Sequence, residues 1–268
     1  MDMKMRLISF ASEVKVAKPS KNNNNTTKES IYRLSAESKK SGRDFGYATA
    51  TAKKLRKAFA PLLALTADKI VINRLNKRFI AVLKTVSESE KGAKNFKNGK
   101  ISLLQGFEFN QHKSLENLLR IAPLIEMIED GILKISIPAS PTATLIEFCH
   151  RKDTANLHLM VFSLDLIGDQ HKIFKAKTLV LPFKIPDFKG AHIELEIDQQ
   201  GEQALFVAMG ITYASDGTVS GDRRYYASKL VTAIHLREGK IVKFEPQILP
   251  PPANQKEEED HDGDWTAC

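Results

Sequence analysis

The feature that most constrains the fold is a change in the spacing of apolar residues near residue 125. Beyond this point apolar and polar residues alternate in short segments, which are separated by turn signals such as Gly168-Asp169, Asp216-Gly217 and Glu238-Gly239. A period of two indicates strands with one buried face, and no helical pattern lies between the segments. Short strands joined by tight turns predict an antiparallel β-sandwich of jelly-roll or immunoglobulin-like type.

Eight segments carry this alternating pattern, and each is expected to contain a strand. They are residues 131–137, 144–150, 157–166, 173–181, 191–198, 203–214, 228–236 and 240–244.

Residues 44–86 show a different spacing, in which apolar residues recur every three or four positions on either side of Pro61. This spacing predicts two amphipathic helices, and we expect Pro61 to end or kink the first because it lacks a backbone N–H. Thr66 or Asp68 is expected to cap the second helix. The buried face of that helix is predicted to be Val71, Leu75, Phe79, Val82, Leu83 and Val86.

Together these patterns predict an α+β protein in four parts. The first part, 1–27, is expected to be a flexible segment because it contains a polar run with four consecutive asparagines. A basic helical region follows at 28–122, and the antiparallel β-sandwich occupies 123–247. The last part, 248–268, is expected to be a disordered acidic tail.

Charge is divided unevenly along the chain. The net charge is +8, but residues 1–100 carry a balance of +15 and residues 101–268 a balance of −7. Such asymmetry favours an anionic partner or contact between the two parts. The basic residues expected on the outer faces of the two helices are Lys53, Lys54, Arg56, Lys57, Arg74, Lys77 and Arg78.

Other candidate sites are weaker. The loop 215–226 contains Arg223, Arg224, Tyr225 and Tyr226 and is expected to be a hairpin tip with some binding potential. Neighbouring residues on a strand point to opposite faces, so Cys149 and His150 are expected to be a core cysteine and a surface histidine. No recognised hydrolase, zinc-protease or nucleotide-binding motif occurs. We therefore predict no catalytic residues, no metal and no cofactor.

Cellular location is inferred from cysteine content and hydropathy. Two cysteines exclude a disulfide scaffold, and no apolar run approaches the roughly 18 residues that span a bilayer. We expect a cytoplasmic protein without membrane contact.

The sequences of three segments resemble those of an uncharacterised protein family from Bacteroidetes bacteria. These segments are GRDFGYATATAKKLRKAFAPLL, NRLNKRFIAVLKT and ISLLQGFEFN, followed by a strand-rich half. The resemblance covers roughly residues 40–240. It implies a basic helical part before a strand-rich part, and it implies no activity.

Two functions remain open at this stage. The first is a non-enzymatic binding or structural module that contacts an unknown protein or a second copy of itself. The alternative is a nucleic-acid-associated protein whose basic helices contact phosphates, with the acidic tail competing for the same surface. An enzyme that uses the loop 215–226 is a third and weaker hypothesis.

Overall fold

A computed structural model describes residues 34–128, 131–168, 170–174 and 177–246, and gives only the backbone of Arg223. The expected flexible segment 1–27 and acidic tail 248–268 lie outside these residues.

Three helices open the described chain: α1 (Ala36–Ala58), α2 (Ala60–Thr66) and α3 (Val71–Leu83). Ser35 caps α1, because its side chain accepts a hydrogen bond from the Ser38 amide. The break expected near Pro61 is present, but it lies at Phe59, two residues before the proline. α1 already ends at Ala58, and Pro61 stands in the first turn of α2, where a missing N–H costs nothing.

The second amphipathic helix matches its prediction, because all six residues of the expected face are buried in α3 and just after it. Asp68 supports the turn before α3 by accepting a hydrogen bond from the Ile70 amide at 3.0 Å. Thr66 does not cap α3. Its hydroxyl bonds the Leu62 carbonyl and the Ser228 hydroxyl instead, which ties α2 to the sheet.

The chain between α3 and the first strand contains four short 3₁₀ turns: Glu88–Glu90, Phe96–Asn98, Ile101–Leu104 and Leu115–Asn117. Only the last of these turns lies in the stretch before Pro123, so the predicted helical region 28–122 has no α-helix after Leu83.

The large sheet is antiparallel and contains β4 (Thr154–Asp165), β5 (His171–Ile173), β6 (Lys177–Pro182), β9 (Glu202–Ser215), β10 (Thr218–Val219), β11 (Tyr226–Arg237) and β12 (Lys240–Ile241). Its strand order is β12-β11-β9-β4-β5, with β6 also paired to β4 and β10 to β9.

The small sheet has the order β1-β2-β8 and is also antiparallel, with β1 (Leu124–Ile128), β2 (Ile132–Ile137) and β8 (Ala191–Glu196). A two-stranded pair, β3 (Ser140–Pro141) with β7 (Asp187–Phe188), lies beside a single helical turn, α4 (Thr142–Leu145). The strand expected at 144–150 was wrong. Thr142 is buried and bonds the Ile185 carbonyl, which fixes a helical turn at this point.

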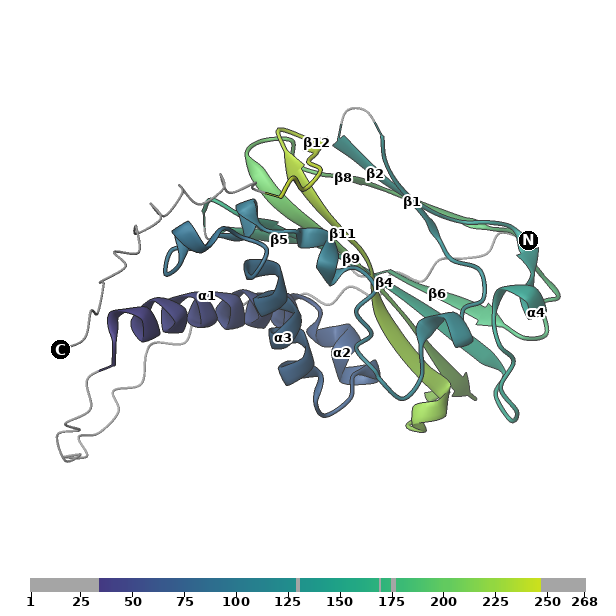
Figure 1. Cartoon of the computed structure of the whole chain (residues 1–268). Coiled ribbons are helices and arrows are strands. Elements are labelled where there is room, and N and C mark those ends of the chain that lie inside the picture. The colour runs from purple at the N-terminus through teal and green to yellow at the C-terminus, as the bar shows by residue number, and fades with distance from the viewer. Residues whose placement is uncertain (1–33, 129–130, 169, 175–176, 247–268) are drawn as a thin grey trace, which may run out of the picture.

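Three layers result, with the large sheet in the middle (Figure 1). Successive residues of β9 face opposite ways. Phe206 packs in the helix-side core, which lies beneath α1, α2 and α3. Val207 packs in the sheet-side core, which lies beneath the small sheet. Thirteen of the fourteen residues of β9 are therefore buried. The structure confirms the predicted α+β class with antiparallel sheets.

A glycine allows the helical layer to approach the sheet closely. A Cβ atom at Gly210 on β9 would lie 2.5 Å from Leu62 Cδ1 of α2 and 3.1 Å from Ser228 Cβ of β11. Only a residue without a side chain leaves room for Leu62 there.

Candidate binding groove on the open side of the sandwich

The predicted basic residues have different environments. Lys53 and Lys57 on α1 and Lys77 and Arg78 on α3 are exposed, and Lys54 is half-buried. Arg56 is also half-buried, and its guanidinium donates to Asn76 Oδ1 at 2.9 Å. Desolvation lowers the pKa of Arg56 from its ordinary value.

Arg74 is an internal anchor. Its guanidinium pairs with Asp68 at 2.6 Å and donates to the carbonyls of Glu108 and Phe109, at 2.8 and 3.1 Å. It also lies over the ring of Phe107 at 5.0 Å. Arg74 therefore joins α3 to the segment at residues 107–109, and both of its terminal nitrogens already donate within the protein.

The basic residues of α3 do not share one flank with those of α1. Asn76, which faces α1 through its bond to Arg56, is two positions from both Arg74 and Arg78. Two positions on a helix are about 200° apart. Arg78 consequently lies on the flank of α3 opposite to α1, and the predicted stripe is divided between two sides of the helical layer.

The loop 215–226 forms the hairpin β9–β10 and a 3₁₀ turn at Arg223–Tyr225. Arg224 pairs with Asp222 at 2.7 Å and lies over the ring of Tyr225. Tyr226 begins β11. The prediction for the Arg223 side chain lies outside what the structure describes. The ion pair of Arg224 is local, whereas Tyr225 packs against the core beneath the small sheet, where its ring contacts Tyr213 and Lys152.

The segment from Gly106 to Phe109 extends the large sheet along part of β11. The amides of Gly106 and Phe109 donate to the carbonyls of Leu230 and Ser228, both at 2.8 Å, and the Leu230 amide donates back to Phe107. Phe107 and Phe109 enter the helix-side core. Glu108 therefore points to the opposite side, as alternation requires.

Glu108 belongs to a charged cluster with Lys229 and Glu116. The Lys229 ammonium lies 3.6 Å from Glu108 Oε1 and also bonds Glu116. Desolvation raises the pKa of Glu108 to about 7. Desolvation also acts to raise the pKa of Glu116, but the bond from Lys229 and its charge help to outweigh it, so this pKa is lowered. Glu108 Oε2 is buried without a hydrogen-bond partner.

A groove of about 430 Å³ lies beside this cluster. Its lining joins the edge of the large sheet to the start of the small sheet, and consists of Gln105, Gly106, Leu115, Glu116, Leu119, Arg120, Ala122, Pro123, Ile125, Lys229, Val231 and Thr232. A break in the β11 register between Leu230 and Thr232 lies at the groove. Glu108 does not line it, so a molecule there would meet Glu116 and Lys229.

Strand β1 is the edge of the small sheet on this side. It pairs with β2, and no strand among the described residues pairs with its other edge. Leu124 and Ile128 are 56% and 42% exposed, whereas Ile125 and Met127 pack toward the sheet-side core. The groove and this free edge together form the open side of the sandwich.

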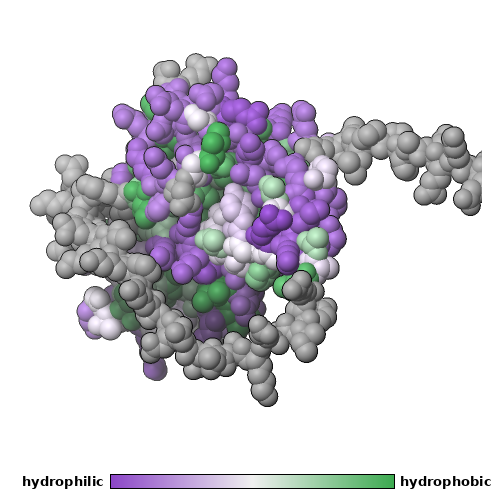
Figure 2. All heavy atoms as spheres, turned by 90° about the vertical axis from the view of Figure 1, so that its left-hand side faces the viewer, coloured by the Kyte–Doolittle hydropathy of each residue, from purple (hydrophilic) through white to green (hydrophobic). Residues whose placement is uncertain are grey.

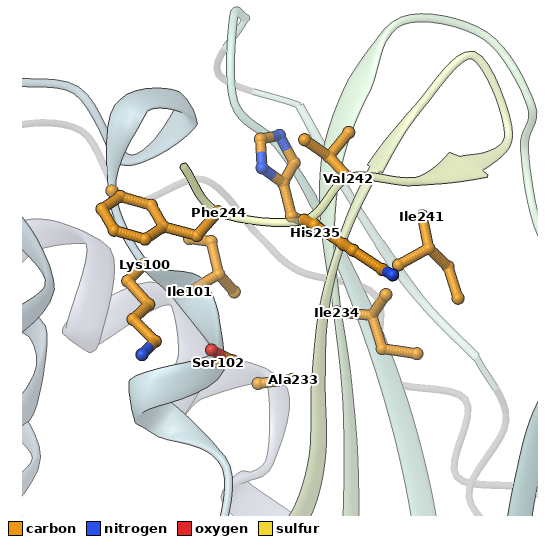
Figure 3. A pocket seen from close by; sticks show the side chains of 11 residues that line it. Lys100, Ile101, Ser102, Ala233, Ile234, His235, Ile241, Val242 and Phe244 are labelled. Carbon is orange, nitrogen blue, oxygen red and sulfur yellow. The ribbon is translucent and has the colours of Figure 1, made fainter. Parts of the chain in front are cut away.

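A second pocket of about 330 Å³ lies where β11 and β12 meet the segment from Lys100 to Ser102 (Figure 3). His235 lines it and bonds Glu202 at 2.9 Å, while Glu202 also accepts from Arg237. Desolvation lowers the pKa of His235, against the opposing effect of Glu202. Among the hydrogen bonds of the described residues, none links His235 to a hydroxyl or thiol. A Ser–His or Cys–His pair of the kind that activates a nucleophile is therefore not formed at His235 among these residues.

Other buried polar groups are internal. His158 bonds Thr178 and Thr212, and desolvation lowers its pKa to about 4. Cys149 is buried and His150 is exposed, as expected, and burial raises the pKa of the Cys149 thiol. No group of three or more metal-ligating side chains occurs among the residues that the structure describes.

Sequence reasoning did not find the groove. Its residues come from 105–125 and 229–232, and only the pairing of residues 106–109 with β11 brings these ranges together. One signal was available for β1. The turn at Asp130-Gly131 requires a partner strand before it, and LIEMI is a short apolar run of strand length at that place.

Comparisons with known proteins add little. No protein-family model matches the chain, and no curated protein matches it. One solved chain, described as "CC2D1B coordinates ESRCT-III activity during the mitotic reformation of the nuclear envelope", is 12% identical to this chain. The match covers 73% of this chain and 72% of that one, with a TM-score of 0.20. The likeness is too slight to carry an argument. Within the described ranges, no helix is long and apolar enough to cross a membrane.

Proposed function

We propose that this protein is a non-enzymatic binding module that holds a partner on the open side of its sandwich. The observation that carries the proposal is the groove of about 430 Å³ beside the edge of β1 that no strand in the described part of the chain pairs with. Apolar walls with a few polar groups are typical of binding sites. Here Leu119, Ile125 and Val231 supply apolar surface, and Glu116 and Lys229 supply charge.

The charged cluster favours binding over catalysis. Two carboxyl groups whose pKa values are shifted apart can serve as an acid–base pair. In this cluster Lys229 stands between them, and Glu108, the group with the raised pKa, does not line the groove. A bound molecule would therefore meet an ion pair rather than a free general acid.

A selection experiment tests the proposal. Random short peptides displayed on phage are selected on the immobilised full chain and then measured against two variants. Ala122→Arg places a bulky charge in the groove, and Ala93→Arg places the same charge on an exposed loop of the helical side. We expect peptides that bind the parent chain and Ala93→Arg equally but bind Ala122→Arg at least about tenfold more weakly. Peptides that ignore Ala122→Arg, or no peptides at all, would rule the groove out.

A second candidate is phosphate contact through the helical layer. Lys53, Lys57 and Lys77 support it because they are exposed. Figure 2 shows a largely hydrophilic surface on the side where α1 begins. Lys53→Glu with Lys57→Glu should then abolish salt-dependent binding to labelled duplex DNA, while Arg78→Glu on the opposite flank should alter it little. A loss of binding free energy in Arg78→Glu about half that of the double variant, in proportion to the charge changed, would instead indicate non-specific attraction by total charge.

A further inference from the structure

The two edges of the small sheet present different side chains to solvent. On β8 the outward residues are His192, Glu194 and Glu196, all polar. On β1 they are Leu124, Glu126 and Ile128, two of them large and apolar. Natural edge strands are usually blunted by charged residues, prolines or bulges. The β8 edge follows this rule, whereas β1 keeps an apolar surface along a backbone edge to which none of the described strands pairs.

The cross-strand neighbours of β1 define the charge that the next strand would carry. Glu126 is opposite Lys134 on β2, and Lys134 is opposite Glu194 on β8. The outer face therefore runs negative, positive, negative across the three strands. Opposite charges on paired strands stabilise a sheet, so a fourth strand beside Glu126 should place a positive side chain there. The residues two positions before and two positions after this positive residue would lie beside Leu124 and Ile128.

A strand added to β1 would also cover the groove. Side chains alternate between the two faces of a strand, so every second residue of the added segment would point toward the large sheet. Ile125, at the start of β1, lines the groove together with Val231 of β11. Apolar or β-branched side chains on this inner face would fill the space between the two sheets.

We propose that β1 binds an extended peptide segment of another protein by strand addition. The segment carries a basic residue opposite Glu126, with apolar residues two positions before and after it. Backbone hydrogen bonds supply affinity, and these three side chains supply selectivity. This inference rests on the proposed function and defines the partner for the same open side of the sandwich.

A second copy of the chain is the weaker occupant for this edge. Symmetric antiparallel pairing of two β1 strands would place Glu126 opposite the second copy's Glu126. Like charges directly opposite each other destabilise a sheet. A partner with a basic residue at this position avoids the repulsion.

The probe is a fluorescein-labelled peptide, Ser-Thr-Val-Thr-Lys-Thr-Val-Thr-Ser, titrated with the full chain and followed by anisotropy. Its Val-Lys-Val pattern at alternate positions is the same in both directions, so it fits β1 in parallel or antiparallel pairing. We expect saturable binding that Leu124→Lys with Ile128→Lys reduces at least about tenfold. The matched double variant on the other edge, His192→Lys with Glu196→Lys, should bind like the parent chain.

Methylation of single peptide nitrogens tests the backbone hydrogen bonds. Each N-methyl group removes one donor, and alternate donors of an added strand face β1. Loss of affinity should therefore recur with a period of two along the peptide. A flat profile, or one with losses at every position, would overturn strand addition.

Charge exchange tests the register. Glu126→Lys should weaken the lysine peptide by up to about fivefold, and a peptide with glutamate in place of lysine should recover that loss. Glu194→Lys on β8 serves as the control and should leave both peptides unaffected. If the exchange has no effect, the basic residue does not lie opposite Glu126 and the proposed partner chemistry is wrong.

The outcomes separate this inference from the proposed function. If Ala122→Arg weakens peptide binding but neither N-methylation nor Glu126→Lys does, the groove remains the binding site and strand addition is overturned. Loss of binding in Ala122→Arg together with the periodic N-methyl profile supports both. If the mass in solution rises from monomer to dimer with protein concentration, and Leu124→Lys keeps the chain monomeric, the occupant of β1 is a second copy. This result would overturn the partner proposed here.

Discussion

The two faces of the large sheet are covered to different extents. On one face α1, α2 and α3 form a core with many aromatic side chains, in which Phe59 packs against Phe109 and Phe162. On the other face a small sheet of three strands covers a sheet with more strands. In the helical layer Arg74 is bound internally, whereas the small sheet leaves a groove and an edge that no described strand pairs with. Incomplete coverage of a sheet can thus create a binding surface without any catalytic motif in the sequence.

The largest expected effects come from adjacent residues of β9 that face the two cores. Phe206→Ala on the helix side should reduce the free energy of unfolding by about 3–5 kcal/mol, and Leu205→Ala on the small-sheet side by about 2–5 kcal/mol. Both side chains are fully buried. Urea denaturation measures both, with the exposed Leu124→Ala as a control that should change stability by less than about 0.5 kcal/mol. A negligible effect of Leu205→Ala would show that the small sheet does not pack as described.

Arg74 and Arg78 should behave differently, although both were predicted as partner-binding residues. Arg74→Met removes the pair with buried Asp68 and two bonds to carbonyl groups. We expect a loss of about 2–4 kcal/mol in the free energy of unfolding. Arg78→Met should change it by less than about 0.5 kcal/mol because Arg78 is exposed. Equal losses in denaturant titrations would contradict the internal role of Arg74.

The carboxyl group of Glu108 should make stability depend on pH near neutrality. Its pKa is about 7 in the folded protein against an ordinary 4.5, so between these values the folded state binds more protons than the unfolded state. Stability should therefore fall as pH rises through this window. Glu108→Gln removes this contribution, and its stability relative to the parent chain should increase by about 1–3 kcal/mol from pH 5 to pH 8.

His158 contributes a pH effect of opposite sign. Its pKa of about 4 lies below the ordinary 6.5, so protonation of the unfolded state lowers stability as pH falls. The parent chain and Glu108→Gln both contain His158. Its effect therefore cancels when the free energies of unfolding of the two proteins are subtracted at each pH. A difference that does not change with pH would mean that Glu108 titrates normally.

The smallest effect is expected at Cys149. Burial raises the pKa of its thiol, so the reactive thiolate is scarce at neutral pH. Iodoacetamide should label Cys149 slowly in the folded protein and rapidly in urea, as peptide mass spectrometry would show. Rapid labelling of the folded chain would indicate that the small-sheet side opens easily.

The sequence predicted long periodic elements well. The face of α3 followed from its spacing of three and four, and β9 and β11 followed from apolar segments between clear turns. Prediction failed where tertiary contacts decide the conformation. Residues 106–109 pair with β11 because Phe107 and Phe109 are drawn into the helix-side core, and no local pattern reveals this partner.

The candidate site was harder to predict than the fold. The count of positive charges on the helices drew attention to Arg74, but a charged residue in the sequence does not reveal whether a buried carboxylate already binds it. The groove depends on two segments more than 100 residues apart in the chain, joined by the pairing of Glu108 with Lys229. Strand β1 is short and half-exposed, so its pattern is weak without the turn that follows it.

The order of the strands along the chain has a consequence for how the protein is made. β4 and β6 lie between β2 and β8 in sequence, and β8 lies between β4 and β9. When β8 completes the small sheet, the large sheet still lacks β9, β11 and β12. A growing chain can form the β1–β2 hairpin early, but that hairpin has no surface to cover until β9 has left the ribosome. Because such distant pairings close slowly, the two sheets should assemble in one late step rather than one after the other.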